Sequence, residues 1–321
     1  MQKVESLPHL ADPDPKELTI EIASTEDWQK GEKTVRAGSN EIFKTILAAL
    51  DSGQGALIGR NGTIELSMMI QLLHEQPFDA DKAAILERNA GIFPRSEAAV
   101  RKWFAEYLSA VVNADCMAVG WYKPLARSEW KILKEKNTSC AKIPLRSLEP
   151  YYCKPLDQWS RILEGRRVTV VSSFAGTMQL QIEYKQQIWP SGHETLLPIA
   201  LWSFVRSYYA PVLAQGRAQW PSGIQSWQSA VDKLEKEVLA TNPEIVLIGC
   251  GGMGMILGHR LKKKGIVAVV MGGAIQVLFG IKGRRWEQHP IISSFWNTDW
   301  IRPNELEMPM AAGSVEGGCY W

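Results

Sequence analysis

The segment EIVLIGCGGMG at residues 244–254 decides the fold. A short run of apolar residues leads directly into a glycine-rich turn, and the apolar residues of the following stretch, up to Lys264, recur at helical spacing. The run IVAVVM at residues 266–271 then has the continuous apolar character of a strand buried on both faces. The order strand, glycine turn, helix, strand predicts one unit of a parallel sheet.

The same alternation of strand and helix extends toward the N-terminus. We predict further strands at residues 56–59, 115–119 and 167–172, and further helices at residues 40–50, 66–73, 96–112, 125–136, 176–188 and 224–241. Asn40 is predicted to cap the first of these helices. The pattern predicts an α/β fold that is Rossmann-like, with a mostly parallel sheet and helices on both faces.

The chain divides into three parts. Residues 1–37 contain prolines and charges without periodicity and are expected to form an extended lead-in. Residues 38–165 are predicted to form an N-terminal Rossmann-like half, and residues 166–321 a C-terminal half with the glycine turn, a basic loop and an aromatic tail. Residues 190–209 fit strand and helix equally, so one continuous sheet and two facing halves both remain open.

Composition excludes several classes of protein. The chain has 321 residues, of which 45% are hydrophobic and 22% charged, and its formal net charge is +2. These values are those of a folded globular protein, and the interspersed charges favour no nucleic-acid partner. No apolar stretch approaches the roughly 18–20 residues of a transmembrane helix, and the N-terminus lacks an export pattern, so we expect a cytoplasmic protein without a transmembrane segment.

Two residue types deviate from a simple pattern. The five cysteines are widely spaced and never form a C-x-x-C pair, which disfavours a zinc site and a disulfide framework. The 13 tryptophans are either large core anchors or flat platforms for sugar rings or bases, and their number alone does not decide between these interpretations.

The glycine turn satisfies the pattern G-x-G-x-x-G. Its glycines are Gly249, Gly251, Gly252 and Gly254. In this position, between a strand and a helix, glycines let the backbone approach a diphosphate, although close packing of the strand on the helix would require similar glycines. Because no carboxylate occurs between Gly249 and Ile281, the sequence disfavours a nicotinamide dinucleotide, which needs one to hold the ribose.

A basic loop follows the second strand of this unit. Lys282, Arg284 and Arg285 occur together, shortly after Gln276. Arginine binds phosphoryl oxygens through two parallel hydrogen bonds, and lysine acts as a point charge. We predict that these four residues bind a diphosphate together with the glycine turn, and a solvated basic turn remains the alternative.

A second polar turn follows the strand at residues 56–59. It has the pattern R-x-G-x-x-E, with Arg60, Gly62 and Glu65. Glu65 is suited either to ligate a divalent cation or to accept the proton of an acceptor hydroxyl, whereas Arg60 is suited to a phosphate or to Glu65 itself. An internal ion pair that shapes the turn is the alternative.

Residues 244–254, residues 272–286 and the ending VEGGCYW at residues 315–321 resemble a family of mostly uncharacterised proteins from bacterial polysaccharide clusters and large viruses. The resemblance covers residues 167–321 best. More distantly, the segment RNGTIE at residues 60–65 is similar to the Arg-Phe-Gly-Asp-Gly-Glu signature of GT-D type glycosyltransferases. In this chain Thr63 stands at the position of the aspartate, while Arg60, Gly62 and Glu65 match.

The resemblance implies a Rossmann-like fold, a nucleoside diphosphate sugar as the donor substrate, and a Mn²⁺ or Mg²⁺ ion held at Glu65. We therefore predict a glycosyltransferase that moves a sugar from this donor to a hydroxyl of a glycan or other acceptor. Arg60 and Glu65 are the predicted catalytic residues, and Gly62 and Thr63 the predicted donor-binding residues of this turn. The alternatives are a non-catalytic nucleotide-binding, sugar-binding or scaffold protein and, more weakly supported, an oxidoreductase. The donor, the acceptor, the stereochemical outcome and the oligomeric state are not predicted.

Overall fold

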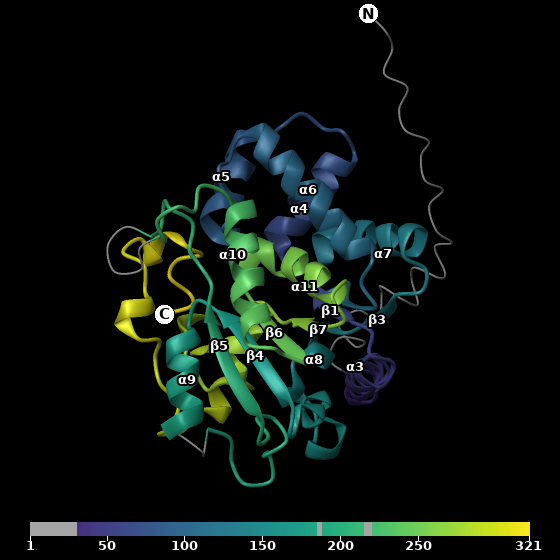
Figure 1. Ribbon diagram of the computed structural model, residues 1–321, viewed down its shortest axis with the longest axis vertical. Coiled ribbons are helices and arrows are strands. Elements are labelled where there is room, and N and C mark those ends of the chain that lie inside the picture. Colours follow the sequence, from purple (N-terminus) through teal and green to yellow (C-terminus); the bar gives the residue numbers. More distant parts are fainter. Residues whose placement is uncertain (1–30, 185–187, 215–219) are drawn as a thin grey trace, which may run out of the picture.

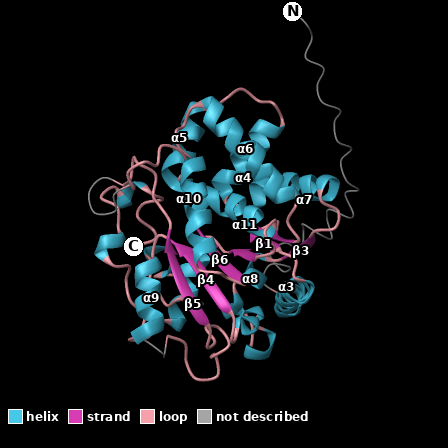
Figure 2. Cartoon of the chain, in the orientation of Figure 1, coloured by secondary structure: helices cyan, strands magenta, loops and turns pink. Residues whose placement is uncertain are grey.

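The computed structural model describes residues 31–184, 188–214 and 220–321. Its centre is a seven-stranded sheet in which every pair of neighbouring strands is parallel (Figures 1 and 2). The strands are β1 (Leu57–Arg60), β2 (Cys116–Ala118), β3 (Ala141–Ile143), β4 (Arg167–Ser172), β5 (Leu201–Arg206), β6 (Ile245–Gly249) and β7 (Val267–Val270). Their spatial order is β3-β2-β1-β7-β6-β4-β5, which confirms the predicted Rossmann-like α/β fold with a parallel sheet.

Helices occupy most of the segments between the strands. They are α3 (Glu32–Ser52), α4 (Thr63–Leu73), α5 (Ala80–Ala90), α6 (Glu97–Val112), α7 (Lys123–Lys136), α8 (Leu145–Leu148), α9 (Ala175–Tyr184), α10 (Trp227–Ala240), α11 (Gly254–Lys262) and α12 (Ala274–Leu278). Side-chain caps begin several of them: Asp79 accepts hydrogen bonds from two amides of α5, and Ser96 accepts one from α6. None of the helices in the described ranges is long and apolar enough to cross a membrane.

The two faces of the sheet are covered by different helices (Figure 1). Successive strand residues point to opposite faces, so Leu57 packs with α4, α5, α6, α7, α10 and α11, whereas Ile58 packs with α3, α8, α9, α12 and the C-terminal segment. The central strands are buried on both faces, as their continuous apolar sequence predicts.

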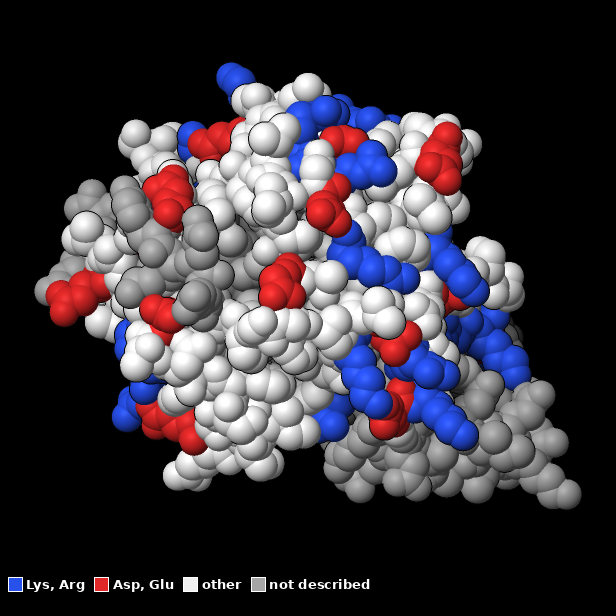
Figure 3. Space-filling view, turned by 90° about the horizontal axis from the view of Figure 1, so that it is seen from below, with Lys and Arg blue, Asp and Glu red and all other residues white. Residues whose placement is uncertain are grey.

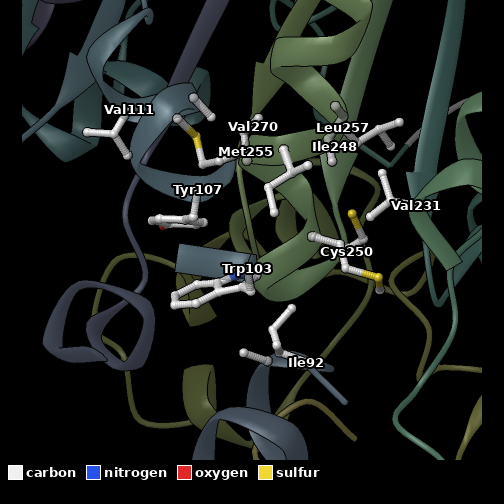
Figure 4. Packing of buried hydrophobic residues seen from close by; sticks show 14 of the residues in the cluster. Ile92, Trp103, Tyr107, Val111, Val231, Ile248, Cys250, Met255, Leu257 and Val270 are labelled. Carbon is white, nitrogen blue, oxygen red and sulfur yellow. The ribbon is translucent and has the colours of Figure 1, made fainter. Parts of the chain in front are cut away.

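Tryptophans anchor the core under the helices. Trp103, Trp159 and Trp227 are fully buried, which confirms the core interpretation for these three residues. Trp103 also fixes the glycine turn, because its indole Nε1 donates a hydrogen bond to the carbonyl oxygen of Gly252 at 3.0 Å. Figure 4 shows Trp103 between Tyr107 and Ile92, close to the strand residues of the sheet.

The strand order reverses between β1 and β7. The chain leaves β1 toward β2 on one side and reaches β7 from β6 on the other. In open parallel sheets, ligands bind in the crevice at the carboxyl ends of the strands where the order reverses. Pairing of β1 with β7 also joins the predicted halves, residues 38–165 and 166–321, in one sheet.

Some predicted boundaries are wrong. Residues 1–30 of the predicted lead-in lie outside the described residues, but helix α3 already begins at Glu32, with Gly31 and not Asn40 at its N-cap. Tertiary packing extends the helix, because Val35 is buried and its carbonyl oxygen accepts a hydrogen bond from the hydroxyl of Ser147. Residues 190–209, whose pattern fits strand and helix equally, contain the edge strand β5. In the N-terminal part of the chain, the pattern did not predict helix α5.

Candidate functional site

A cavity of about 560 Å³ opens at the edge of the sheet where the strand order reverses. The turns that follow β1, β4, β5, β6 and β7 line it, together with the end of α5 and, from the C-terminal tail, Val315, Glu316, Tyr320 and Trp321. Its volume lies in the range of about 300–1,000 Å³ that is usual for small-molecule sites.

The lining combines charges of both signs with aromatic rings. The charged lining residues are Arg60, Arg88, Arg285, Glu65, Glu149 and Glu316. The aromatic ones are Tyr107, Trp121, Phe174, Tyr208, Tyr209, Trp286, Tyr320 and Trp321. Arginines and aromatic rings together suit a ligand that has both an anionic part and a flat or apolar part.

Most of the residues predicted from the sequence converge on this cavity. The lining includes Arg60, Gly62, Thr63, Glu65, Gly249, Gly251, Gln276 and Arg285. The predicted residues Gly252, Gly254, Lys282 and Arg284 are not part of it. Three stretches that are far apart in the sequence, after β1, after β6 and after β7, therefore meet as predicted.

Arg60 presents a cation to the cavity without an ion pair among the described residues. Its guanidinium lies over the ring of Trp121, 4.4 Å from the ring centroid, and its Nε donates to the carbonyl oxygen of Asn61 at 3.3 Å. A Cβ placed on Gly272 would be 3.5 Å from Nη1 of Arg60, so the guanidinium lies against the turn after β7. The alternative of an Arg60–Glu65 ion pair is not what the described residues show.

Glu65 lies in the first turn of α4 and is only 8% exposed. A Cβ on Gly62 would overlap Oε2 of Glu65, so the carboxylate occupies the space beside position 62. Burial raises the pKa of Glu65, while a hydrogen bond to its own backbone amide and the positive charge of Arg60 oppose that rise. The carboxylate thus folds back on the turn and helps to shape it.

The glycine turn after β6 is packed tightly by the protein itself. Gly251 has a φ of +58°, and a Cβ there would be 2.7 Å from the carbonyl oxygen of Ala90 at the end of α5. A Cβ on Gly252 would be 2.9 Å from Cγ1 of Ile92. Both glycines are therefore required by the approach of the end of α5 and of the residues that follow it, whatever binds in the cavity.

The two outer glycines of the motif also lie close to neighbouring side chains, and Gly249 more closely than Gly254. A Cβ on Gly249 would be 2.6 Å from Cγ2 of Ile275, and one on Gly254 would be 3.1 Å from Cγ1 of Val270. Close packing therefore explains the glycines at positions 249, 251 and 252, whereas a Cβ at position 254 would make only a tight contact with Val270. The backbone of Gly249 and Gly251 nevertheless borders the cavity.

Arg285 reaches the cavity in the company of the C-terminal tail. Its Nη2 lies 2.6 Å from Oε2 of Glu316, and its guanidinium lies over the ring of Tyr320, 4.5 Å from the centroid. The backbone amide of Arg285 donates to the carbonyl oxygen of Cys319 at 3.0 Å. The charge of Arg285 is therefore partly balanced by a carboxylate that borders the same cavity.

The predicted cluster of three cations does not form at the cavity. Nζ of Lys282 lies 5.7 Å from the centroid of the Trp296 ring, and Arg284 is exposed. Residues 284–286 form a short 3-10 helix, in which successive side chains point about 120° apart. This geometry sends Arg284 and Arg285 in different directions, so Arg285 alone of the three lines the cavity.

Gln276 carries an unsatisfied polar atom at the cavity. The side chain is 1% exposed, and its Nε2 donates to the carbonyl oxygen of Tyr320 at 2.7 Å, but its Oε1 has no partner among the described residues. The indole Nε1 of Trp121 is also buried without a partner there. Because buried polar groups are nearly always hydrogen-bonded, both atoms are candidates to bind a ligand.

Sequence reasoning missed Glu149, Arg88 and Glu316. Glu149 follows the short helix α8 and belongs to none of the motifs. Burial raises its pKa to about 7, and the positive charges of Arg60, Arg146 and Arg285 oppose that rise. The only local signal in the sequence is the proline at position 150, which favours an extended backbone at Glu149 but says nothing of a cavity.

The surroundings of Glu65 do not fit the predicted cation. Mn²⁺ and Mg²⁺ bind several oxygen ligands, usually including carboxylates. Within the described ranges, no group of three or more His, Cys, Asp and Glu side chains is arranged to hold a metal ion. Thr63, at the position of the signature aspartate, supplies no carboxylate, so no chemical step is assigned to a metal here.

Outside the cavity, charges are mixed. On the face shown in Figure 3, acidic and basic side chains are interspersed over most of the surface, and the basic ones on its right-hand side have acidic neighbours.

The fold and the cavity define an α/β protein with a Rossmann-like parallel sheet and a ligand-sized pocket at its carboxyl edge. The sequence matches no protein-family model, no curated protein and no solved structure.

Proposed function

We propose that the protein is a glycosyltransferase that transfers a sugar from a nucleoside diphosphate sugar to a hydroxyl of a glycan or other acceptor, in the cytoplasm. The observation that carries this proposal is the convergence of Arg60, the last residue of β1, and Arg285, from the segment after α12, on one cavity with aromatic walls. A diphosphate requires cations from two sides, and a base or sugar ring is accommodated by aromatic surfaces.

Arg60 is the primary diphosphate ligand in this proposal. Its ring contact with Trp121 holds the guanidinium in place, and no carboxylate of the described residues neutralises it at ion-pair distance. The second cation, Arg285, is shared with Glu316. The unsatisfied Oε1 of Gln276 is an acceptor for a hydroxyl of the sugar or ribose.

The proposed chemistry uses these charges at the leaving group. As the bond between the anomeric carbon and the diphosphate oxygen breaks, negative charge grows on that oxygen, and cations fixed beforehand stabilise it most in a cavity of low polarity. Arg60 and Arg285 would supply this stabilisation without a metal ion.

The two stretches that resemble glycosyltransferases and polysaccharide-cluster proteins support the proposal jointly. Residues 60–65 and 315–321 are separated by almost the whole chain, yet both contribute side chains to the same cavity. A shared surface is what a common ligand site would require.

Saturation-transfer NMR with UDP, GDP, ADP, CDP and dTDP tests the proposal. We expect at least one of these nucleoside diphosphates to receive saturation from the protein, and the matching nucleotide sugars to be hydrolysed slowly when water is the only acceptor. Binding of none of the five would contradict the proposal.

A non-catalytic nucleotide-binding protein is the second candidate. Thr63 at the aspartate position and the absence of a metal-ligand cluster in the described ranges favour it. Binding of a nucleoside diphosphate without hydrolysis or transfer of any nucleotide sugar would identify this second function.

A further inference from the structure

We infer that Glu149 is the catalytic base that takes the proton from the acceptor hydroxyl. The inference rests on the proposed transferase function and replaces the sequence-based assignment of that role to Glu65. It depends on where Glu149 lies and on what its carboxylate does not contact.

Glu149 borders the cavity from the turn between α8 and the 3-10 helix at residues 150–152. It comes from the opposite face of the sheet to α4, which carries Glu65. The positive charges of Arg60 and Arg285 both act on its carboxylate. Glu149 therefore lies within electrostatic range of both proposed diphosphate ligands.

The three lining glutamates differ in what their carboxylates contact. That of Glu65 is folded over Gly62 and bonded to its own backbone amide. That of Glu316 is paired with Arg285. The carboxylate of Glu149 has no hydrogen bond and no ion pair among the described residues, so its oxygens are available to an acceptor.

The backbone at Glu149 is held rigidly, as a base must be. Pro150 follows it, and the next residue, Tyr151, is 4% exposed and stacked on Trp189 with ring centroids 5.9 Å apart. The amide of Glu149 donates to the carbonyl oxygen of Arg146 at 3.3 Å. These contacts position the side chain without using its carboxylate.

The protonation of Glu149 is compatible with this role. Burial raises its pKa to about 7, against a usual value of 4.5. A general base is most effective when its pKa lies near the working pH, because a large fraction of it is then deprotonated and the carboxylate is still basic enough to accept the proton of the hydroxyl. Above pH 7 most of the molecules would carry the carboxylate form.

In the proposed step, the acceptor oxygen attacks the anomeric carbon of the donor. A bond forms between this oxygen and the carbon, the bond from the carbon to the diphosphate oxygen breaks, and its electron pair leaves with the diphosphate. The hydroxyl proton moves to the carboxylate of Glu149, which later loses it to water. A single displacement of this kind inverts the configuration at the anomeric carbon.

The experiment compares Glu149→Gln with the wild-type protein and with the control Glu164→Gln, which makes the same change at an exposed position outside the cavity. Two quantities are measured: binding of UDP, GDP, ADP, CDP and dTDP, and the rate of nucleoside diphosphate release from the corresponding nucleotide sugars with water as the acceptor, as a function of pH.

We expect Glu149→Gln to bind the nucleoside diphosphate at least as tightly as the wild type, because the substitution removes a negative charge, and to release it from the donor about 10²–10⁴-fold more slowly, the usual contribution of a general base. We expect the wild-type rate to fall below pH 7 and this fall to be missing in Glu149→Gln. Glu164→Gln should behave as the wild type.

Different results would refute the transferase function and the role of Glu149. If the wild type binds none of the nucleoside diphosphates, the proposed function itself fails. If the wild type binds one but neither hydrolyses nor transfers any donor sugar, the transferase function fails and nucleotide binding stands. If the wild type hydrolyses a donor and Glu149→Gln retains the wild-type rate and pH profile, the role of Glu149 alone is refuted. A product with retained anomeric configuration would also refute it.

Discussion

The turns after β1 and after β6 lie at the same edge of the sheet and have the same order of strand, turn and helix, but they are built differently. The turn after β1 directs Arg60 at the cavity and rests on buried polar groups. The turn after β6 contributes backbone to the cavity, and neighbouring protein atoms occupy the space beside its glycines. A glycine motif thus marks close packing here, while the less conspicuous turn carries the side chains of the proposed ligand site.

Substitution at Gly251 should have the largest effect on stability. Gly251→Ala places a Cβ 2.7 Å from the carbonyl oxygen of Ala90 in a backbone with φ of +58°. The left-handed conformation costs about 1–2 kcal/mol and the overpacking about 1–3 kcal/mol. Urea unfolding at 25 °C should therefore show a loss of about 2–5 kcal/mol.

Gly53 provides a matched control for this prediction. It has a similar φ of +66°, but nothing lies within 4 Å of a Cβ placed there. Gly53→Ala should lose only the conformational part, about 1–2 kcal/mol. Equal losses for the two variants would show that the glycine turn after β6 is not closely packed, and the comparison of the two turns would fail.

The buried hydrogen-bond network next to the turn after β1 should make the stability of the protein depend on pH. Glu129 is 1% exposed and accepts hydrogen bonds from Nδ2 of Asn61 at 2.8 Å and from the amide of Gly120 at 2.9 Å. Asn61 in turn accepts a hydrogen bond from the hydroxyl of Tyr107 at 3.0 Å. Asn61, the central residue of this network, directly follows Arg60 in the sequence.

Burial raises the pKa of Glu129 from 4.5 to about 7. Between these pH values the folded protein binds more protons at this site than the unfolded chain does, so stability falls as pH rises and levels off above pH 7. The contribution is about 3 kcal/mol. Chemical unfolding at a series of pH values should show this fall, reduced by that amount in Glu129→Gln. Identical pH profiles for the variant and the wild type would contradict the assignment.

A smaller effect, on the affinity for a nucleoside diphosphate, is expected from a substitution at Glu316 in the C-terminal tail. Glu316→Gln removes the partner of Arg285 and a negative charge near Glu65. Since exposed ion pairs contribute about 0.2–1 kcal/mol, the affinity for a nucleoside diphosphate should rise by a factor of up to about five. Calorimetric titration measures it, and a weaker affinity in the variant would indicate that Glu316 itself binds the ligand.

The sequence predicted the parallel sheet and the strands β1, β2, β4, β6 and β7, most of which are continuously apolar, but it missed the short edge strand β3 and left β5 undecided. It also predicted that Arg60, Gly251 and Arg285 would share one edge, since the carboxyl ends of parallel strands always do. It failed where tertiary contacts decide. Packing against Ser147 moved the start of α3 ahead of Asn40.

The candidate site also depends on tertiary structure that the local sequence pattern does not reveal. The 3-10 helix after Gly283 directs the side chains of Arg284 and Arg285 apart. The presence of adjacent arginines in the sequence does not reveal this separation. Glu149 was missed because its importance comes from the cavity around it and from the free state of its carboxylate in the described structure, neither of which is visible in a local pattern.

The central claim is that this cavity holds a diphosphate through Arg60. The most direct measurement titrates the nucleoside diphosphate that binds best into the wild type, Arg60→Ala and the control Arg127→Ala, which removes an exposed arginine of α7 outside the cavity. The account predicts that Arg60→Ala weakens binding by about 1.5–3 kcal/mol, as expected for hydrogen bonds to charged groups, and that Arg127→Ala changes nothing. Equal affinities for all three proteins would contradict it.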